Sequence, residues 1–555
     1  MQNSIATYQI EILNDSFHFE GNDCDQTVVV KTFVENKLVT KIKYGLVTKE
    51  KVYTQLKIGD HINLSRCYVK DFSISEFKKS INHDDLEHID VNHFVAEDAF
   101  FDCSLRTDFS YINFNGIAKF NDTVFSHGNI SFYQCRFNND SPVEFKHVEF
   151  GNGEISFQYV EFNNETTAFT GVKFYGGVVS FVNANFKNGD VLFNNVDFYN
   201  SRVKFHFAKF GNGAVNFNKA RFGDKLVDFR KVEFGAGRVD FRRAAFGNCY
   251  VNFDESEIIK GKFNFRSARF GNNDITFKLV NFGEADVLFE NVNFGTGQLS
   301  FSESTSKYIS FKGSRLDVFL DLCVKKAEII DLSQTVLRDI IDVKPINHQV
   351  NIQKLYLNEM RNLGRIIIDW KDNNVLELIS NQKKTSLRQK SEQFNILKEN
   401  FELSGQYNDE DKSYIQFKRF ELKADYREAI KSGGTKLFNL PNFAFRWLIF
   451  DKMGLFATNP LRVLFSMLVI YVLFSLVYLS LTLFGIGGIV NSVGAVDGLS
   501  NIQTCFYHSA ITFLTIGYGD YYPTGISRGI SILEGWSGLF LMSYFTVAFV
   551  RKILR

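Results

Sequence analysis

Phenylalanine recurs at a regular spacing through the middle of the chain. Between Phe145 and Phe253 the steps from one Phe to the next alternate between five and seven residues, and after Ile258 the pattern resumes and reaches Phe301. Val or Ala stands two positions before most of these Phe residues, often with Asn or Asp in between. A sustained internal period predicts a repeat architecture, in which each unit stacks its apolar residues on those of the next.

Near the C-terminus, two long apolar runs contain almost no charged residues. Leu461–Phe484 has Arg462 as its one charged residue, and Gly529–Val550 has only Glu534. Each run has at least the ~20 residues that a helix needs to cross a bilayer. The sequence therefore predicts an all-α region with two membrane spans.

The segment between the repeat and the first span has helical patterning. Gln349–Ser380 is mixed and predicted to be partly helical, whereas Leu387–Leu403 and Asp409–Ile430 have apolar residues at helical spacing. These two helices form either a hairpin that packs on its symmetry mates or a simple spacer. Gly433–Gly434 is a candidate hinge, and Phe443–Phe456 is predicted to lie at the membrane interface.

Residues 1–108 contain short β-like runs without a recognisable motif. We expect a small strand-rich domain that caps the repeat, because a stack of repeats needs polar ends. The alternative is a ligand-binding module.

Composition adds few constraints. The chain has 555 residues, too many for one ordinary domain, and a formal net charge of +1, so no nucleic-acid partner is expected. A basic cluster around Arg230 and Arg242 is interleaved with acidic residues and is interpreted as a solvated face. The six cysteines before the spans lack CxxC spacing, which argues against a zinc site. No cofactor is expected.

Triplets such as Val215-Asn216-Phe217 and Val227-Asp228-Phe229 resemble the pentapeptide repeat, whose unit is a small residue, Asp or Asn, then a large apolar residue. The resemblance implies a parallel β-solenoid over residues 109–340, with Phe ladders in its core. The seven-residue step departs from the family pattern, and we infer a 24-residue coil with about eight coils between 109 and 301. Glycines such as Gly211 and Gly235 are expected at corners that need positive φ.

Residues 512–523 contain a motif that lies between the two apolar runs. Its core resembles the selectivity filter of potassium channels, with Ile in a place where Val is commoner; the matching residues are Thr515, Ile516, Gly517, Tyr518, Gly519 and Asp520. The resemblance implies that potassium binds the backbone carbonyls of Thr515, Ile516, Gly517 and Tyr518, together with the Thr515 hydroxyl. Successive carbonyls that point the same way need backbone angles open mainly to glycine.

The resemblance, which covers 441–555, also implies roles for residues around the filter. Ile502–Leu514 is expected to be the pore helix, with Tyr507 holding Asp520 and His508 reaching Tyr518 of a neighbour. Glu534 is expected to support the filter from behind; Ser531 also fits a capping box with it. Gly538 falls at the family's hinge glycine, and a face below it is the candidate gate: Met542, Thr546 and Val550.

The distribution of Lys and Arg predicts the orientation. Lys452 precedes the first span and Arg462 lies at its start. Arg551 and Lys552 follow the second span, and the loop 485–527 contains no Lys or Arg. The positive-inside rule then places both ends of the chain in the cytoplasm and the spans in the plasma or inner membrane.

We therefore expect a multidomain protein in which a cytoplasmic solenoid precedes a two-span pore. The expected domains are a cap at 1–108, the solenoid at 109–340, a helical connector at 341–435, an interfacial helix at 436–460 and the pore domain at 461–555. The expected function is a homotetrameric potassium channel gated by the solenoid and an unknown cytoplasmic ligand or protein. The alternatives are a constitutive channel whose solenoid is a scaffold, and a poorly selective cation channel. No enzymatic activity is expected.

Overall fold

The computed structural model describes residues 6–104, 106–344, 349–432, 435–494 and 498–554. These form two compact units, Met1–Gln382 and Lys383–Arg555, which we describe separately. The candidate hinge at Gly433–Gly434 lies outside the described residues.

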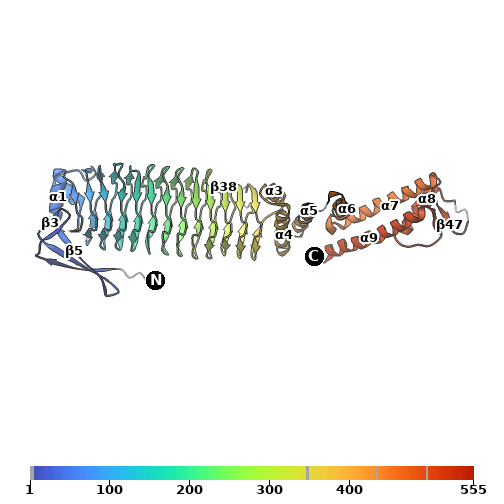
Figure 1. Ribbon diagram of the computed structural model, residues 1–555, viewed down its shortest axis with the longest axis horizontal. Coiled ribbons are helices and arrows are strands. Elements are labelled where there is room, and N and C mark those ends of the chain that lie inside the picture. The colour runs from blue at the N-terminus through green and yellow to red at the C-terminus, as the bar shows by residue number, and fades with distance from the viewer. Residues whose placement is uncertain (1–5, 105, 345–348, 433–434, 495–497, 555) are drawn as a thin grey trace. The chain divides into compact units, whose positions relative to one another are not determined.

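The first unit is a four-sided parallel β-solenoid, visible as the ladder of short strands in Figure 1. A 13-stranded sheet runs from β6 (Ile62–Asn63) to β44 (Ile352–Tyr356), and a 12-stranded sheet from β11 (Arg106–Asp108) to β46 (Arg365–Ile367). The other two faces have shorter sheets linked by single bridges. On one of these faces the coils contribute strands from β7 (Cys67–Lys70) to β22 (Lys173–Phe174) and from β36 (Asn293–Phe294) to β45 (Arg361–Asn362). On the other they contribute strands from β8 (Ile89–Val91) to β20 (Glu161–Phe162) and from β26 (Lys209–Phe210) to β32 (Glu257–Ile258).

The strand register confirms the inferred coil length. Phe150 pairs with Phe174, and Val179 pairs with Val203, so the coils in this part of the solenoid advance by 24 residues. Equivalent Phe rings therefore stack: the centroid of Phe205 lies 4.8 Å from that of Phe181 with an interplanar angle of 3°. These rings are fully buried. The inter-strand spacing of ~4.8 Å lets the rings stack in continuous ladders along the core.

The explanation expected for the corner glycines is wrong. Gly211 and Gly235 are absent from the positive-φ residues, and a Cβ at either would overlap backbone of the preceding coil. These corners need glycine because the chains approach closely. The positive φ falls instead on turn residues two places after a Phe, such as Lys219 (58°), Lys231 (54°) and Arg243 (57°).

The solenoid is longer than the Phe spacing indicated. Its strands begin at β6 and continue through β46, so β44, β45 and β46 all lie within the expected connector, whose helices start later. Apolar residues such as Leu337, Ile341 and Leu355 replace Phe in the core there. The coil also shortens, since Ser300 pairs with Asp321. These coils could not be predicted from the sequence, because both the recurring Phe and the fixed period are lost there.

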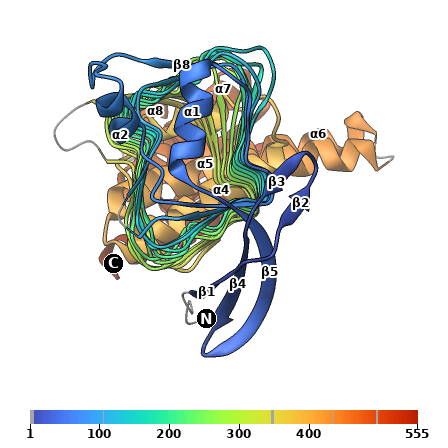
Figure 2. The ribbon, with the colours of Figure 1, turned by 90° about the vertical axis from the view of Figure 1, so that its left-hand side faces the viewer.

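The N-terminal end of the solenoid carries an antiparallel extension and a helix. β1 (Thr7–Leu13), β4 (Thr27–Val34) and β5 (Lys37–Val47) pair antiparallel, and β5 joins the solenoid by pairing with β7. A small hairpin, β2 (Phe17–Phe19) and β3 (Asn22–Cys24), lies beside β5. Helix α1 (Lys49–Ile58) lies across the open end of the coils (Figure 2) and buries Val52 and Leu56.

Two further helices complete this unit. α2 (Ile74–Ser80) begins at Ser73, whose side chain accepts from the Glu76 amide, and buries Phe77 and Lys78. α3 (Val375–Ser380) follows the last coil and packs against β44.

The second unit begins with a helical hairpin. α4 (Leu387–Leu403) starts with a capping box and α5 (Tyr407–Lys431) returns along it, with the rings of Phe394 and Phe420 5.5 Å apart. Gly405, at φ 69°, lies in the turn between them. α6 (Lys436–Arg446) follows and continues into a π-helical segment, Trp447–Met453, and a short 3₁₀ turn, Leu455–Ala457.

Three helices and two short strands follow in the second unit. α7 (Pro460–Leu483), α8 (Asn501–Phe513) and α9 (Ser527–Ile553) are joined by β47 (Gly487–Asn491) and β48 (Tyr521–Gly525), which pair antiparallel. Within the described ranges, two helices are long and apolar enough to cross a membrane, α7 and α9. These match the two spans predicted from sequence.

Candidate functional site

The candidate site is the segment Thr515–Asp520, which follows the C-terminal end of α8. α8 begins with a capping box in which Ser500 and Gln503 exchange hydrogen bonds. Its C-terminal end carries the partial negative charge of the helix dipole, which favours a cation nearby.

The backbone of this segment alternates in conformation. Thr515, Gly517 and Gly519 have φ of 55°, 63° and 76°, whereas Ile516 and Tyr518 are not in the left-handed region. A Cβ on either glycine would meet nothing within 4 Å in this chain. The two glycines are therefore required by their backbone angles, because side chains rarely adopt positive φ.

Three backbone amides anchor the start of the segment to α8. The Ile516 and Gly517 amides both donate to the Ile511 carbonyl, at 2.8 and 3.3 Å. The Thr515 amide donates to the Thr512 carbonyl at 3.1 Å, and its hydroxyl donates to the Leu514 carbonyl at 2.7 Å. The segment therefore leaves the helix in a defined direction.

The segment lies on the surface of its unit. Ile516 is 48% exposed and Tyr518 71% exposed. Two adjacent large side chains at such exposure form an unpaired face, which is typical of a surface that other molecules cover.

Tyr507 holds the end of the segment. Its hydroxyl donates to Asp520 Oδ2 at 2.6 Å, and the Tyr521 amide donates to Asp520 Oδ1 at 3.1 Å. The Asp520 carbonyl accepts from the Ser492 amide at 2.8 Å, which ties the segment to the loop after β47.

His508 points into its own unit. Its Nε2 lies 3.0 Å from the Ser531 hydroxyl on α9, and its ring meets Tyr478 on α7 edge to face at 5.2 Å. In this chain His508 is 4% exposed and packs against the two long helices.

Glu534 joins the three helices of the candidate pore. It is fully buried on α9 and accepts from the Tyr478 hydroxyl on α7 at 2.7 Å and from the Ser509 hydroxyl on α8 at 2.5 Å. One carboxyl group on α9 therefore bonds to both α7 and α8. The capping-box interpretation of Ser531 is wrong, because α9 begins four residues earlier, at Ser527.

Gly538 has a packing role that sequence analysis did not identify. A Cβ there would overlap the Phe513 carbonyl at the end of α8. Glycine at this position lets α9 approach the candidate filter closely, and α9 runs unbroken through it.

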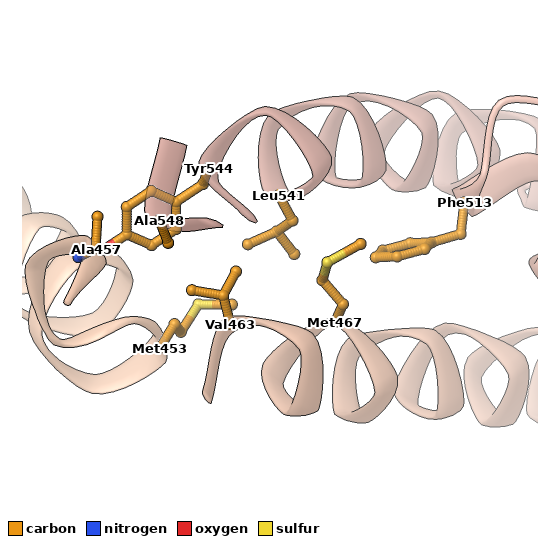
Figure 3. Close-up of a cluster of buried hydrophobic side chains, with 8 residues drawn as sticks. All are labelled: Met453, Ala457, Val463, Met467, Phe513, Leu541, Tyr544 and Ala548. Carbon is orange, nitrogen blue, oxygen red and sulfur yellow. The ribbon is translucent and has the colours of Figure 1, made fainter. Parts of the chain in front are cut away.

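The two faces of α9 below Gly538 differ. The expected gate residues are exposed in the single chain: Met542, Thr546 and Val550. On the other face Leu541, Tyr544 and Ala548 pack against α7 (Figure 3). Facing them in this cluster are Met453, Ala457, Val463, Met467 and Phe513.

Tyr544 fixes the turn that leads into α7. Its hydroxyl accepts from the Ala457 amide at 2.9 Å and donates to the Phe450 carbonyl at 3.2 Å. A Cβ on Gly454 would overlap its ring. Sequence analysis missed this contact, because a single Tyr within an apolar run gives no local signal.

A charged contact joins the hairpin to the end of α9. The Arg551 guanidinium lies 3.2 Å from Glu410 and 3.4 Å from Asp411, and Lys552 Nζ lies 2.6 Å from Asp411. Arg551 also lies over the Tyr414 ring, 4.1 Å from its centroid. We call these five residues the charged clasp.

The charges of the clasp are opposite in sign to the partial charges of the helix ends on which they lie. Glu410 and Asp411 lie at the start of α5, and Arg551 and Lys552 lie in the last turn of α9. Each charge therefore opposes the partial charge of its own helix end. From the sequence, Arg551 and Lys552 indicated only the orientation in the membrane. Their acidic partners lie about 140 positions away, and no local pattern identifies them.

Two more ion-pair groups hold α6 and the π-helical segment to α5. Arg419 donates to Asp451 at 2.8 Å. Asp425 accepts from Arg388 at 2.7 Å and from Arg446 at 3.0 Å. Burial opposes ionisation of Asp425, but the hydrogen bonds from the two arginines outweigh burial and lower the pKa of its carboxyl.

Within the described ranges, no group of three His, Cys, Asp or Glu side chains is placed to hold a metal ion.

Comparison with known proteins supports the interpretation of this region. Residues 466–555 match the family described as ion channel, of the two-transmembrane type. No curated protein and no solved structure matches the chain. The matched residues include α8, most of α7, all of α9 and the Thr515–Asp520 segment.

Proposed function

We propose that this protein, an ion channel chain of the two-transmembrane type, assembles as a homotetramer that conducts potassium selectively. The observation that carries the proposal is the alternating backbone of Thr515–Asp520, with positive φ at Thr515, Gly517 and Gly519. Alternation of this kind turns successive carbonyl oxygens toward the same side, which is the arrangement that replaces the water around a dehydrated potassium ion.

The exposure of the segment supports assembly around it. One chain supplies a single strip of carbonyls, which does not enclose an ion. Four copies arranged around an axis would cover Ile516 and Tyr518 and complete rings of oxygens. The carbonyls of Thr515, Ile516, Gly517 and Tyr518 would be the ligands, with potassium as the permeant ion and no cofactor.

The contacts behind the segment support rigidity. Tyr507 restrains Asp520, and Glu534 joins α8 to both long helices. A filter that selects between cations by its oxygen field needs such support, because a loose filter would adapt to the smaller sodium ion.

The test of selectivity is ion flux from liposomes that contain the full chain. We expect potassium flux well above sodium flux for the natural sequence. Gly517→Ala should abolish it, because alanine is strained at a φ of 63°. Gly535→Ala is the matched control, since its Cβ meets nothing within 4 Å on α9. Equal sodium and potassium permeability would instead establish the poorly selective channel.

We further propose that the hairpin transmits the state of the solenoid to α9. The solenoid precedes α4 and α5 in the chain, whereas α9 follows both spans, so the covalent path from the solenoid leads to α7. The clasp supplies a direct noncovalent path to α9, where Met542, Thr546 and Val550 form the proposed gate and Gly538 its proposed hinge.

This gating proposal requires the clasp and the gate to be on one side of the membrane. Lys452, Arg551 and Lys552 lie near the ends of the spans that we place in the cytoplasm, and the loop between the spans lacks Lys and Arg. The solenoid would then be cytoplasmic and the protein would lie in the plasma or inner membrane, with both termini inside.

Flux measurements on clasp variants test the gating proposal. Glu410→Gln with Asp411→Asn removes both carboxylates, and we expect the open probability to change. Lys398→Gln with Glu402→Gln removes a surface ion pair on α4 and is the control. If both pairs of substitutions leave flux unchanged, the solenoid is a scaffold and the pore conducts constitutively.

A further inference from the structure

A polar cavity of about 490 Å³ lies near the N-terminal end of the solenoid. Its floor is the outer face of the first three strands of the 12-stranded sheet, β11, β15 (Asn129–Ser131) and β19 (Gly153–Ser156). Its wall is α2 and the segment 81–88 that follows it, which contribute Ser75, Lys78, Asp85 and Leu86. The cavity therefore lies between a regular sheet and a separate overhanging segment.

The floor presents a column of hydrogen-bonding side chains. Asp108, Ser131 and Ser156 occupy paired positions on three successive strands. The Ser110 hydroxyl lies 2.6 Å from Asp108 Oδ1 and 2.8 Å from the Ser131 hydroxyl. Ser75 on α2 also bonds to Asp108. The buried Asp108 carboxylate thus holds the Ser110 hydroxyl beside that of Ser131.

Lys78 holds the wall in place. This side chain is 1% exposed, and its ammonium donates to the backbone carbonyls of Asp85, at 2.9 Å, and of Glu87. It also lies 4.7 Å from the centroid of the Tyr111 ring. These contacts fix the segment 81–88 against α2 and hold the wall of the cavity.

The rim adds amides, charges and apolar surface. Gln158 and Asn129 supply amide groups, and Glu154 and Arg106 supply exposed charges. Leu86 is 70% exposed at the overhang. Side chains that combine donors, acceptors and an apolar edge are suited to a molecule with hydroxyl groups on a carbon ring.

The charge balance selects among such molecules. The lining includes three acidic residues, Asp85, Asp108 and Glu154, against two basic ones, Arg106 and Lys78, and Arg106 lies 3.6 Å from Asp108. A lining with so little net charge, and that slightly negative, favours a neutral ligand over a phosphate or another anion. The volume lies within the ~300–1,000 Å³ typical of small-molecule sites.

We propose that this cavity binds a neutral polyhydroxylated small molecule, a sugar or a cyclic polyol. The floor hydroxyls and the amides of Asn129 and Gln158 would bond its hydroxyl groups, and Leu86 would cover its apolar face. The inference goes beyond the proposed function and is independent of it, because binding to the solenoid is measured without ion flux.

The test uses the full chain in detergent micelles. Thermal unfolding and calorimetry are measured with millimolar glucose, trehalose or myo-inositol, and with ATP as an anionic probe. A ligand that binds the folded state raises the unfolding temperature of the solenoid. We expect stabilisation by at least one neutral probe and none by ATP.

Variants of exposed rim residues locate the binding. Glu154→Gln with Gln158→Ala should weaken it at least tenfold while leaving the buried floor intact. Arg202→Ala is the matched control, because Arg202 lies on the same sheet two strands beyond Glu154 and outside the cavity. The proposal is overturned if no neutral probe binds, if ATP binds more tightly than all of them, or if the rim variant binds like the control.

Discussion

The carboxylate of Glu534 provides the sharpest test of how the pore helices are held together. It is fully buried and accepts from Tyr478 on α7 and Ser509 on α8. Both donors are also fully buried, so neither gains water when the carboxylate is removed. Glu534→Ala should therefore destabilise the packing of all three helices.

The magnitude follows from the contacts. Leaving a buried hydrogen-bond donor or acceptor without its partner costs about 1–3 kcal/mol. Glu534→Gln keeps the shape and one acceptor oxygen, so we expect a loss of about 2 kcal/mol. Glu534→Ala removes both bonds and leaves a cavity, for an expected loss of about 3–5 kcal/mol. Tyr478→Phe removes one bond and should resemble the Gln variant.

The assay is the free energy of unfolding of the purified chain in detergent, followed by potassium flux in liposomes. Ser537→Ala is the control: Ser537 lies about one turn later on α9, is half-buried, and its hydroxyl donates to the Leu533 carbonyl of its own helix. We expect the order of stability to be natural sequence and Ser537→Ala, then Glu534→Gln, then Glu534→Ala. If Glu534→Ala unfolds within about 0.5 kcal/mol of the natural sequence, the three-helix contact does not hold the pore.

Three further predictions concern other parts of the chain. Phe205→Ala should destabilise the solenoid by about 3–5 kcal/mol, because the ring is fully buried in a ladder, and hydrogen exchange should rise in the neighbouring coils. Gly538→Ala should lower the unfolding free energy through overlap with the Phe513 carbonyl; an altered gate with unchanged stability would favour a hinge over a packing role. The pKa of Asp425 is lowered from 3.8, so its pairs with Arg388 and Arg446 stabilise α6 at neutral pH. That contribution is lost as pH falls below 3.8 through the lowered pKa, and Asp425→Asn should abolish this pH dependence of exchange in α6.

Much of the solenoid was predictable from sequence. The alternating steps of five and seven residues predicted the coil length, and the pairing of Phe150 with Phe174 confirms it. The ends were not predictable, because Leu and Ile replace Phe in the core and the coil shortens after Ser300. Only the structure could show why Gly211 and Gly235 are glycines. A close approach between coils and a positive φ both favour glycine, so the sequence does not distinguish them.

The backbone of the Thr515–Asp520 segment and the two long apolar helices could likewise be predicted from sequence. A run of apolar residues long enough to cross a bilayer is a local property, and so is the preference of Gly517 and Gly519 for positive φ. The sequence indicated which residues would support this segment, but not which groups they contact. His508 was expected to reach Tyr518 of a neighbour and in this chain meets Ser531, while Glu534 contacts two other helices at once.

By itself, the sequence determined the features that depend on spacing along the chain: the coil period, the spans and the backbone of the candidate filter. The tertiary structure decided those that depend on distant residues meeting: the Glu534 contacts, the clasp between Glu410 and Arg551, and the polar cavity beneath α2. The physical reason is that periodic burial and backbone preference act within a few residues of the chain. Ion pairs and cavities instead arise only when the packing of whole elements brings their groups within a few ångströms.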